Sequence, residues 1–162
     1  MIPEGYKLEQ SILYGMRKSH PGLLEVVICN PKQRNAIGTP AEQKMLEIFT
    51  KASEDPNVKV ILFHGGQFFS SGNDLSMFSR IKQEDMAKEA EKGVLGVLTS
   101  MLMAMATCKK PIVAVVRGAA VGIGFTLLNH CHFVYCTPET KFMTPFMKSN
   151  QSPEGTSTLI FP

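Results

Sequence analysis

Short segments that favour β-strands alternate along this chain with segments that favour helices. The strand-like runs are residues 23–29, 59–64, 111–116, 132–136 and 141–144. The helix signals lie after residue 38, at 84–107 and at 125–129. This alternation is typical of α/β proteins and argues against an all-α or all-β fold. The sequence contains no internal repeat and no dividing linker, so we expect a single domain over residues 1–162.

The segment that starts at Thr39 carries the signals of a helix start. We expect Thr39 as the N-cap and Pro40 as the first helical residue, with Glu42 close behind. Apolar residues follow at spacings of three and four, and this face is therefore expected in the core. They are Met45, Ile48 and Phe49.

The composition excludes several classes of protein. Hydrophobic residues make up 44% and charged residues 19%, which rules out a disordered or low-complexity chain. The net charge is +3 and no basic run exceeds Lys109-Lys110, so nucleic-acid binding is not expected, although an anionic small molecule would suit the charge. No apolar stretch predicts a membrane span, and residues 1–14 show no targeting signal.

The four cysteines, at positions 29, 108, 131 and 136, form no CxxC pair. This usage is typical of reduced, buried thiols in an intracellular protein. A strand would direct His130 and His132 to one face and Cys131 to the other. We therefore predict no metal site.

Residues 69–75 form a loop of small and polar residues after an expected strand. Gly72 permits a backbone turn that a Cβ atom would forbid. Such a loop can direct a backbone N–H toward a ligand oxygen. The alternative is a plain strand-to-helix turn in which Asn73 or Asp74 caps the helix.

Residues 118–125 are rich in glycine and alanine. Small residues let a backbone or a ligand approach closely, and the N–H groups at a helix start attract negative charge. The positions of Gly118, Gly122 and Gly124 do not match the dinucleotide-binding fingerprint. The alternative is that this segment only allows close helix packing.

Glu154 stands between a proline and a glycine in an apolar part of the sequence. Desolvation there would raise the pKa of its carboxyl group toward that of a useful general base. The alternative is an exposed loop glutamate. The sequence has no G-x-S-x-G motif, so Ser70, Ser71 and Ser152 do not indicate a serine hydrolase.

Four segments, in this order, resemble motifs of the crotonase superfamily, the enoyl-CoA hydratases and isomerases. They are residues 30–37, 70–75, 110–124 and the Pro153-Glu154 loop, and the resemblance runs from Leu23 to Pro162. It implies an α/β, crotonase-like core of stacked ββα turns. It also implies a thioester-binding cleft between the two glycine-rich loops.

The resemblance places the oxyanion hole on the backbone N–H groups of Ser71 and Ile123. It further implies that the glycine-rich loops and the 30–37 segment contact the acyl-CoA thioester. The residues expected to bind substrate are Lys32, Ala36, Ser71, Gly72, Asn73, Asp74, Leu75, Gly122 and Ile123. An apolar wall for the acyl group is expected from Phe78, Phe125, Phe142 and Phe146.

Two positions indicate which member of the superfamily this chain resembles. Thr126 and Phe146 stand where hydratases carry glutamates, so two-carboxylate hydration of a double bond is not expected. The context of Glu154 is similar to that of peroxisomal-type Δ3,Δ2-enoyl-CoA isomerases, in which a single glutamate of this loop is the base.

The resemblance therefore implies isomerisation of 3-enoyl-CoA to trans-2-enoyl-CoA in the β-oxidation of unsaturated fatty acids. Glu154 would move a proton from C2 to C4, while Ser71 and Ile123 would hold the thioester oxygen. No cofactor is expected, because coenzyme A is part of the substrate. The resemblance further implies a peroxisomal or mitochondrial matrix location and a homo-trimer.

Two features depart from the family pattern. His132 stands where the family usually has an acidic residue. The apolar run that ends on Pro162 is a poor natural terminus, so we expect a domain that is incomplete at its C-terminal end. The alternatives are therefore a non-catalytic acyl-CoA binder, a structural subunit of a larger assembly, or another crotonase chemistry such as thioester hydrolysis.

Overall fold

A six-stranded mixed sheet dominates the computed structural model, which describes residues 2–76 and 96–161. Its strand order is β1-β2-β3-β4-β5-β7, antiparallel from β1 to β3 and parallel from β3 to β7. These strands are β1 (Tyr6–Glu9), β2 (Ile12–Met16), β3 (Leu23–Ile28), β4 (Val60–His64), β5 (Ile112–Val116) and β7 (Phe133–Cys136). A second, two-stranded parallel sheet pairs β6 (Ala119–Val121) with β8 (Lys141–Met143).

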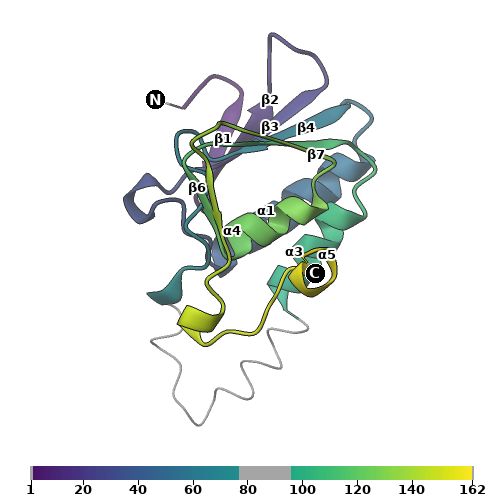
Figure 1. Cartoon of the computed structure of the whole chain (residues 1–162). Coiled ribbons are helices and arrows are strands. Elements are labelled where there is room, and N and C mark those ends of the chain that lie inside the picture. Colours follow the sequence, from purple (N-terminus) through teal and green to yellow (C-terminus); the bar gives the residue numbers. More distant parts are fainter. Residues whose placement is uncertain (1, 77–95, 162) are drawn as a thin grey trace.

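The strands of the large sheet alternate between buried and less buried side chains. In β3, Leu24, Val26 and Ile28 face the core, and Ile61 and Phe63 of β4 continue the same layer. The helices α1 (Thr39–Glu54) and α3 (Val97–Ala106) pack against one another. Figure 1 shows α1 beneath the six-stranded sheet. The predicted α/β class and the predicted strands are thus confirmed.

The helix α1 begins as the sequence indicates, with one difference. Its N-cap is Gly38 rather than Thr39, so Thr39 is the first helical residue and Pro40 the second. Proline is tolerated there because the first N–H groups of a helix have no partner within the helix. The buried face contains the predicted apolar residues and one carboxylate, and its members are Ala41, Glu42, Met45, Ile48, Phe49 and Ala52.

The second half of the chain continues with short elements. They are α4 (Ile123–Thr126), the 3₁₀ turns η4 (Leu127–His130) and η5 (Met147–Ser149), and α5 (Ser157–Ile160); η1 (Pro31–Gln33) lies earlier in the chain. The helix predicted at residues 84–107 is present as α3, while its expected first part lies outside the described residues. Two strands followed by a helix, β5-β6-α4, agree with the expected ββα pattern.

Two expectations about histidine and cysteine are wrong. His130 closes the turn η4 and does not lie on a strand, and the ring nitrogen Nδ1 of His132 accepts a hydrogen bond from the Ile112 N–H (3.1 Å). Of the cysteines only Cys108 is buried, and Cys136 is exposed on β7. Within residues 2–76 and 96–161, no group of three His, Cys, Asp or Glu side chains could hold a metal ion.

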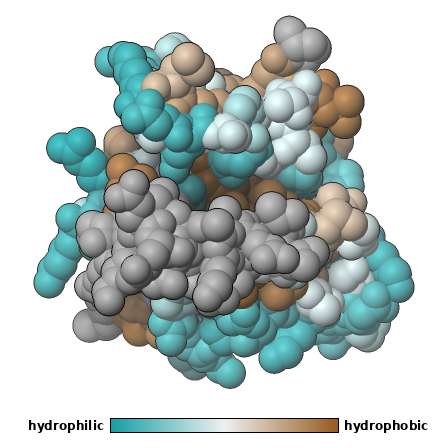
Figure 2. Space-filling view, turned by 90° about the horizontal axis from the view of Figure 1, so that it is seen from below, coloured by the Kyte–Doolittle hydropathy of each residue, from teal (hydrophilic) through white to brown (hydrophobic). Residues whose placement is uncertain are grey.

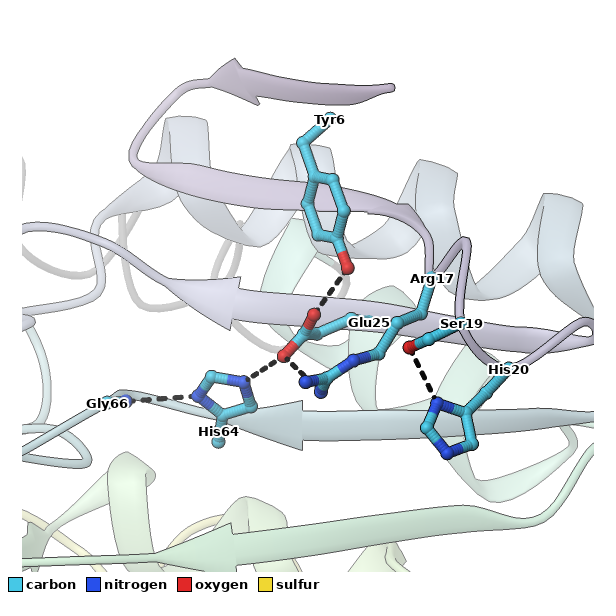
Figure 3. A network of polar contacts seen from close by, with 7 residues as sticks. All are labelled: Tyr6, Arg17, Ser19, His20, Glu25, His64 and Gly66. Carbon is cyan, nitrogen blue, oxygen red and sulfur yellow. Dashed lines mark hydrogen bonds and ion pairs between the residues drawn. The ribbon is translucent and has the colours of Figure 1, made fainter. Parts of the chain in front are cut away.

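A polar network lies on the face of the sheet away from the buried side chains (Figure 3). The Glu25 carboxylate accepts a hydrogen bond from the Tyr6 hydroxyl and contacts His64 Nε2 at 2.9 Å. Arg17 lies at 3.5 Å from the same carboxylate. The network joins β1, β3 and β4.

No helix in the described part of the chain is long and apolar enough to cross a membrane.

Candidate functional site

The two glycine-rich loops lie directly against one another. The Ser70 N–H donates to the Ala119 carbonyl (3.1 Å), and the Val121 N–H donates to the Ser70 carbonyl (3.0 Å). Ser70 itself is fully buried, and its hydroxyl donates to the Asn35 carbonyl (2.8 Å). Ser70 therefore holds the loops together and is not placed as an exposed nucleophile.

Two glycines allow this close approach. Gly72 has φ +94°, and a Cβ atom there would lie 2.7 Å from the Val121 carbonyl oxygen. A Cβ atom on Gly124 would lie 2.7 Å from the Ser70 Cβ. A side chain at either position would force the loops apart.

Ser71 does not offer the free donor that the sequence predicts. Its backbone N–H donates to the Arg34 carbonyl (3.0 Å), and its hydroxyl donates to the Gln33 carbonyl (3.2 Å). Both groups tie the loop to the segment that precedes α1. Ser71 thus holds the loop in place, and a substrate oxygen could take its N–H only by breaking this bond.

The Asn73 backbone N–H, two positions later, is a better candidate. No described residue accepts a hydrogen bond from it, whereas the N–H of Asp74 donates to Ile37 (2.9 Å). The Ile123 N–H likewise has no described acceptor, as expected for the first residue of a helix. Nothing in the local sequence distinguishes Asn73 from Ser71 as the free donor, because the acceptor of the Ser71 N–H, Arg34, lies in a distant segment.

Glu154 lies next to α4, as part of the loop that precedes α5. The Thr126 hydroxyl donates to its Oε1 atom (3.0 Å), and Thr126 is fully buried. The other oxygen, Oε2, is buried without a hydrogen-bond partner among the described residues. The site therefore holds one anchored and one free carboxylate oxygen.

The surroundings of Glu154 change its acidity in the predicted direction. Burial raises the pKa of its carboxyl group, and the hydrogen bond from Thr126 offsets part of that rise. A carboxylate with a raised pKa and a free oxygen is suited to accept a proton.

Aromatic rings pack against Phe125 of α4, and a cavity lies around η5. The Phe125 ring lies 4.8 Å from those of Phe142 and Phe161, measured between centroids. A cavity of about 440 Å³ is lined by residues 143–148, Gln151 and Pro153. Phe146 lines it, whereas Phe78 lies outside the described residues. Figure 2 shows hydrophobic residues between hydrophilic ones on the face seen from below.

The remaining predicted binding residues gather around the first glycine-rich loop. Lys32 is exposed on η1, Ala36 is half-buried, and Leu75 is exposed. Asp74 is half-buried, and its carboxylate accepts a hydrogen bond from the Ser76 N–H (3.1 Å). Gly122 has φ +53° and precedes Ile123 at the start of α4. The structure thus brings the 30–37, 70–75 and 118–125 segments together.

One buried carboxylate was predicted only as part of a helix start. Glu42 lies on the buried face of α1, with 8% of its surface exposed. The signal was present, because Glu42 precedes Met45 by three residues and so continues the apolar stripe.

Comparisons with known proteins agree with this arrangement. The family model described as Enoyl-CoA hydratase/isomerase matches residues 18–162. Human enoyl-CoA delta isomerase 2 is 35% identical over 144 residues, which is 89% of this chain and 36% of that protein. Mouse enoyl-CoA delta isomerase 3, peroxisomal, is 31% identical over 89% of this chain and 45% of its own length.

Solved structures share the fold. The enoyl-CoA hydratase/isomerase of Pseudoalteromonas atlantica T6c is 26% identical and superposes with a TM-score of 0.79, over 94% of this chain and 56% of that one. The chain therefore spans less than half the length of the two curated relatives and about half of this solved structure.

Proposed function

Because the chain belongs to the enoyl-CoA hydratase/isomerase family, we propose that it isomerises 3-enoyl-CoA to trans-2-enoyl-CoA in the β-oxidation of unsaturated fatty acids. The observation that supports this proposal is the hydrogen bonding of the two carboxylate oxygens of Glu154. One carboxylate oxygen is held by Thr126 and the other is buried without a described partner, beside two glycine-rich loops. The delta isomerases among the relatives support this choice within the family.

In the proposed reaction, Glu154 takes a proton from C2 of the substrate. The electrons of the C2–H bond form the C2=C3 double bond, and those of the C3=C4 bond accept a proton from Glu154 at C4. The thioester oxygen carries negative charge in between. We propose that the N–H groups of Asn73 and Ile123 stabilise it, each donor contributing about 10²–10³ in rate.

This reaction transfers a proton and adds no water, so one base is sufficient. Thr126 donates to Glu154 and Phe146 lines the cavity, and neither can activate water as a carboxylate would. We therefore propose isomerisation rather than hydration. The proposal needs no cofactor beyond the coenzyme A of the substrate.

The setting of the reaction is part of the same proposal. A peroxisomal or mitochondrial matrix location is consistent with β-oxidation, and one relative carries the word peroxisomal in its name. A homo-trimer remains the proposed assembly. Imaging of a tagged chain and light scattering of the purified chain would test these two points.

The experiment that tests the proposal is the substitution Glu154→Gln. Glutamine keeps the shape of the side chain but cannot accept the proton, so turnover of a 3-enoyl-CoA should fall by at least about a hundredfold. Formation of the conjugated product can be followed by its ultraviolet absorbance. Binding of the ester, measured by calorimetry, should change little.

The control is Glu139→Gln, which removes an exposed carboxylate between β7 and β8. It should leave turnover unchanged. Near-normal turnover in Glu154→Gln would refute Glu154 as the base. An unmodified chain that binds the ester but does not turn it over would favour the non-catalytic acyl-CoA binder.

A further inference from the structure

The side chain of Asn35 is buried, with 5% of the residue exposed, and each of its polar atoms has a hydrogen-bond partner. Its Nδ2 group donates to the carbonyl oxygens of Gly65 (2.9 Å) and Phe68 (2.6 Å). Its Oδ1 atom accepts a hydrogen bond from the Asn30 N–H (2.8 Å). Because carbonyls need donors and an N–H needs an acceptor, the carboxamide can take only this orientation.

The backbone of Asn35 has a conformation that few residues adopt. Its φ is +56°, in the left-handed region, which asparagine tolerates better than most residues with a side chain. A residue in such a conformation persists only where its surroundings require it, and these positions concentrate at functional sites. The groups that Asn35 holds in place therefore indicate its role.

The carboxamide of Asn35 binds to the loop at residues 65–68, which is itself fixed to the large sheet. In this loop, the Gly66 N–H donates to Nδ1 of His64 on β4 (3.1 Å; Figure 3). The strand β4 lies between β3 and β5 in the sheet. Asn35 thus ties the 30–37 segment to a rigid part of the molecule.

The carbonyl of Asn35 starts a series of hydrogen bonds that leads to the first glycine-rich loop. It accepts from the Ser70 hydroxyl (2.8 Å), and the hydroxyl oxygen accepts from the Gly72 N–H (3.1 Å). Ser70 is fully buried, so this series lies inside the protein. The Gly72 carbonyl accepts from the N–H of Ile37, two residues after Asn35 (2.8 Å). Asn35 and its neighbour therefore hold Gly72 at both its N–H and its carbonyl.

The hold on Gly72 determines the direction of the Asn73 N–H. The Gly72 carbonyl and the Asn73 N–H belong to one planar trans peptide unit, in which the two groups point in opposite directions. Since the carbonyl points toward the Ile37 N–H, the Asn73 N–H points away from Ile37 and has no described acceptor. A carbonyl that accepts a hydrogen bond also polarises the N–H of the same peptide unit, which makes the Asn73 N–H a stronger donor.

We propose that Asn35 is a positioning residue, which holds the Gly72–Asn73 peptide so that the Asn73 N–H faces the thioester oxygen of the substrate. Asn35 would do so without touching the substrate. A donor that is fixed before the reaction needs no reorganisation when negative charge develops on that oxygen. The effect on catalysis rests on the proposed function, whereas the hold on the loop does not.

Two substitutions of Asn35 test the hold. Asn35→Asp keeps the shape and the acceptor for the Asn30 N–H, but it places an oxygen against the carbonyls of Gly65 and Phe68. Asn35→Gly adopts the positive φ without strain and removes the carboxamide altogether. The second variant keeps the test available if the aspartate variant does not fold.

Amide hydrogen exchange, followed by NMR, measures the hold without any substrate. The reference is the Ile61 N–H, which donates to the Pro111 carbonyl at the start of β4 (2.9 Å) and reports on unfolding of the whole sheet. In both variants, exchange at Gly72 and Asp74 should accelerate at least about tenfold more than exchange at Ile61. Equal acceleration at all three amides, or none, would overturn the hold.

The effect on catalysis has separate readouts. For a 3-enoyl-CoA, kcat per binding-competent chain should fall at least about tenfold in Asn35→Asp, while Kd changes by at most about threefold. Calorimetry gives both Kd and the binding-competent fraction. The infrared carbonyl stretch of bound trans-2-enoyl-CoA should shift less than in the unmodified chain, because one of its two donors is misdirected. A residue that only supports folding would change neither kcat per competent chain nor this stretch.

Asn57→Ala is the matched control. It also removes a carboxamide, but this group donates to Asp55 (3.0 Å) within one exposed turn, so exchange, kcat and the carbonyl stretch should stay unchanged. Faster exchange at Gly72 with an unchanged kcat and stretch would overturn the effect of Asn35 on catalysis. An unmodified chain that binds the ester without turnover would refute the proposed function, and the exchange rates would still decide whether Asn35 holds the loop.

Discussion

The Thr126 hydroxyl is a single group on which the ionisation of Glu154 depends. It is fully buried and donates to Glu154 Oε1 at 3.0 Å, which favours the ionised carboxylate. The resemblance to hydratases would place a glutamate at this position. A hydroxyl here therefore supports a neighbouring base instead of supplying another one.

We predict that Thr126→Val moves the acid limb of the pH–rate profile to higher pH. Valine has nearly the same shape but cannot donate, so desolvation of Glu154 is no longer offset and its pKa rises further. At a pH on the acid limb, the rate should fall about threefold to tenfold. Thr126→Ser keeps the donor and should retain the original profile. A Val variant with an unchanged profile would contradict this role.

At the scale of elements, the contact between the two glycine-rich loops organises the site. We predict that Gly72→Ala lowers the free energy of unfolding by about 1–3 kcal/mol and reduces turnover. The added Cβ atom would lie 2.7 Å from the Val121 carbonyl oxygen, at a φ of +94°. Urea unfolding and the isomerase assay measure the two effects.

Gly66→Ala is the matched control for this prediction. Gly66 also has a positive φ, +72°, but a Cβ atom there meets nothing within 4 Å. Its substitution should cost only the backbone strain and leave turnover unchanged. Equal losses in both variants would show that strain, and not the loop contact, is responsible.

The network in Figure 3 joins the strands β1, β3 and β4 through Glu25. Burial opposes ionisation of Glu25, but the hydrogen bonds from Tyr6 and His64 outweigh it and lower the pKa of the carboxyl group. The unfolded chain therefore binds more protons in the acid range. The stabilisation by Glu25 is present above pH 4.5 and is lost as the pH falls through the lower folded value.

We predict that Glu25→Gln lowers the free energy of unfolding by about 1–3 kcal/mol at pH 7 and by clearly less at pH 3. Urea unfolding at the two pH values measures the difference. Glu4→Gln, which breaks an exposed ion pair with Lys18, should have little effect at either pH. An equal loss at both pH values would contradict the role of the charge.

At the scale of the whole molecule, one end of the large sheet exposes apolar side chains. β7 is an edge strand, and all four of its residues are exposed, with Phe133 at 58% and Tyr135 at 62%. An exposed apolar edge strand promotes pairing with other chains. We predict that the chain self-associates as its concentration rises, and that Phe133→Ser with Tyr135→Ser weakens this association at least about threefold.

Light scattering across a concentration series measures the association. The paired substitution Phe142→Ser and Met143→Ser, on the exposed strand β8 of the small sheet, serves as the comparison. It should weaken association less, because β8 lies outside the large sheet. A chain that stays monomeric at every concentration would refute the prediction.

The sequence by itself determined the α/β class, most strand positions and the buried stripe of α1. These features are local, because the periodicity of neighbouring residues and the turn residues between the elements indicate each strand or helix. The N-cap of α1 was misplaced by one residue, since Gly38 and Thr39 are both compatible with that position.

Only the tertiary structure decided which groups of the site are free. The Ser71 N–H is taken by Arg34 and the Asn73 N–H is not, and nothing local distinguishes the two. Likewise, Thr126 and Glu154 are separated by 28 positions, and their hydrogen bond exists only because the loop that precedes α5 folds against α4. Hydrogen-bond partners and electrostatic neighbours come from distant segments, so local sequence patterns do not reveal them.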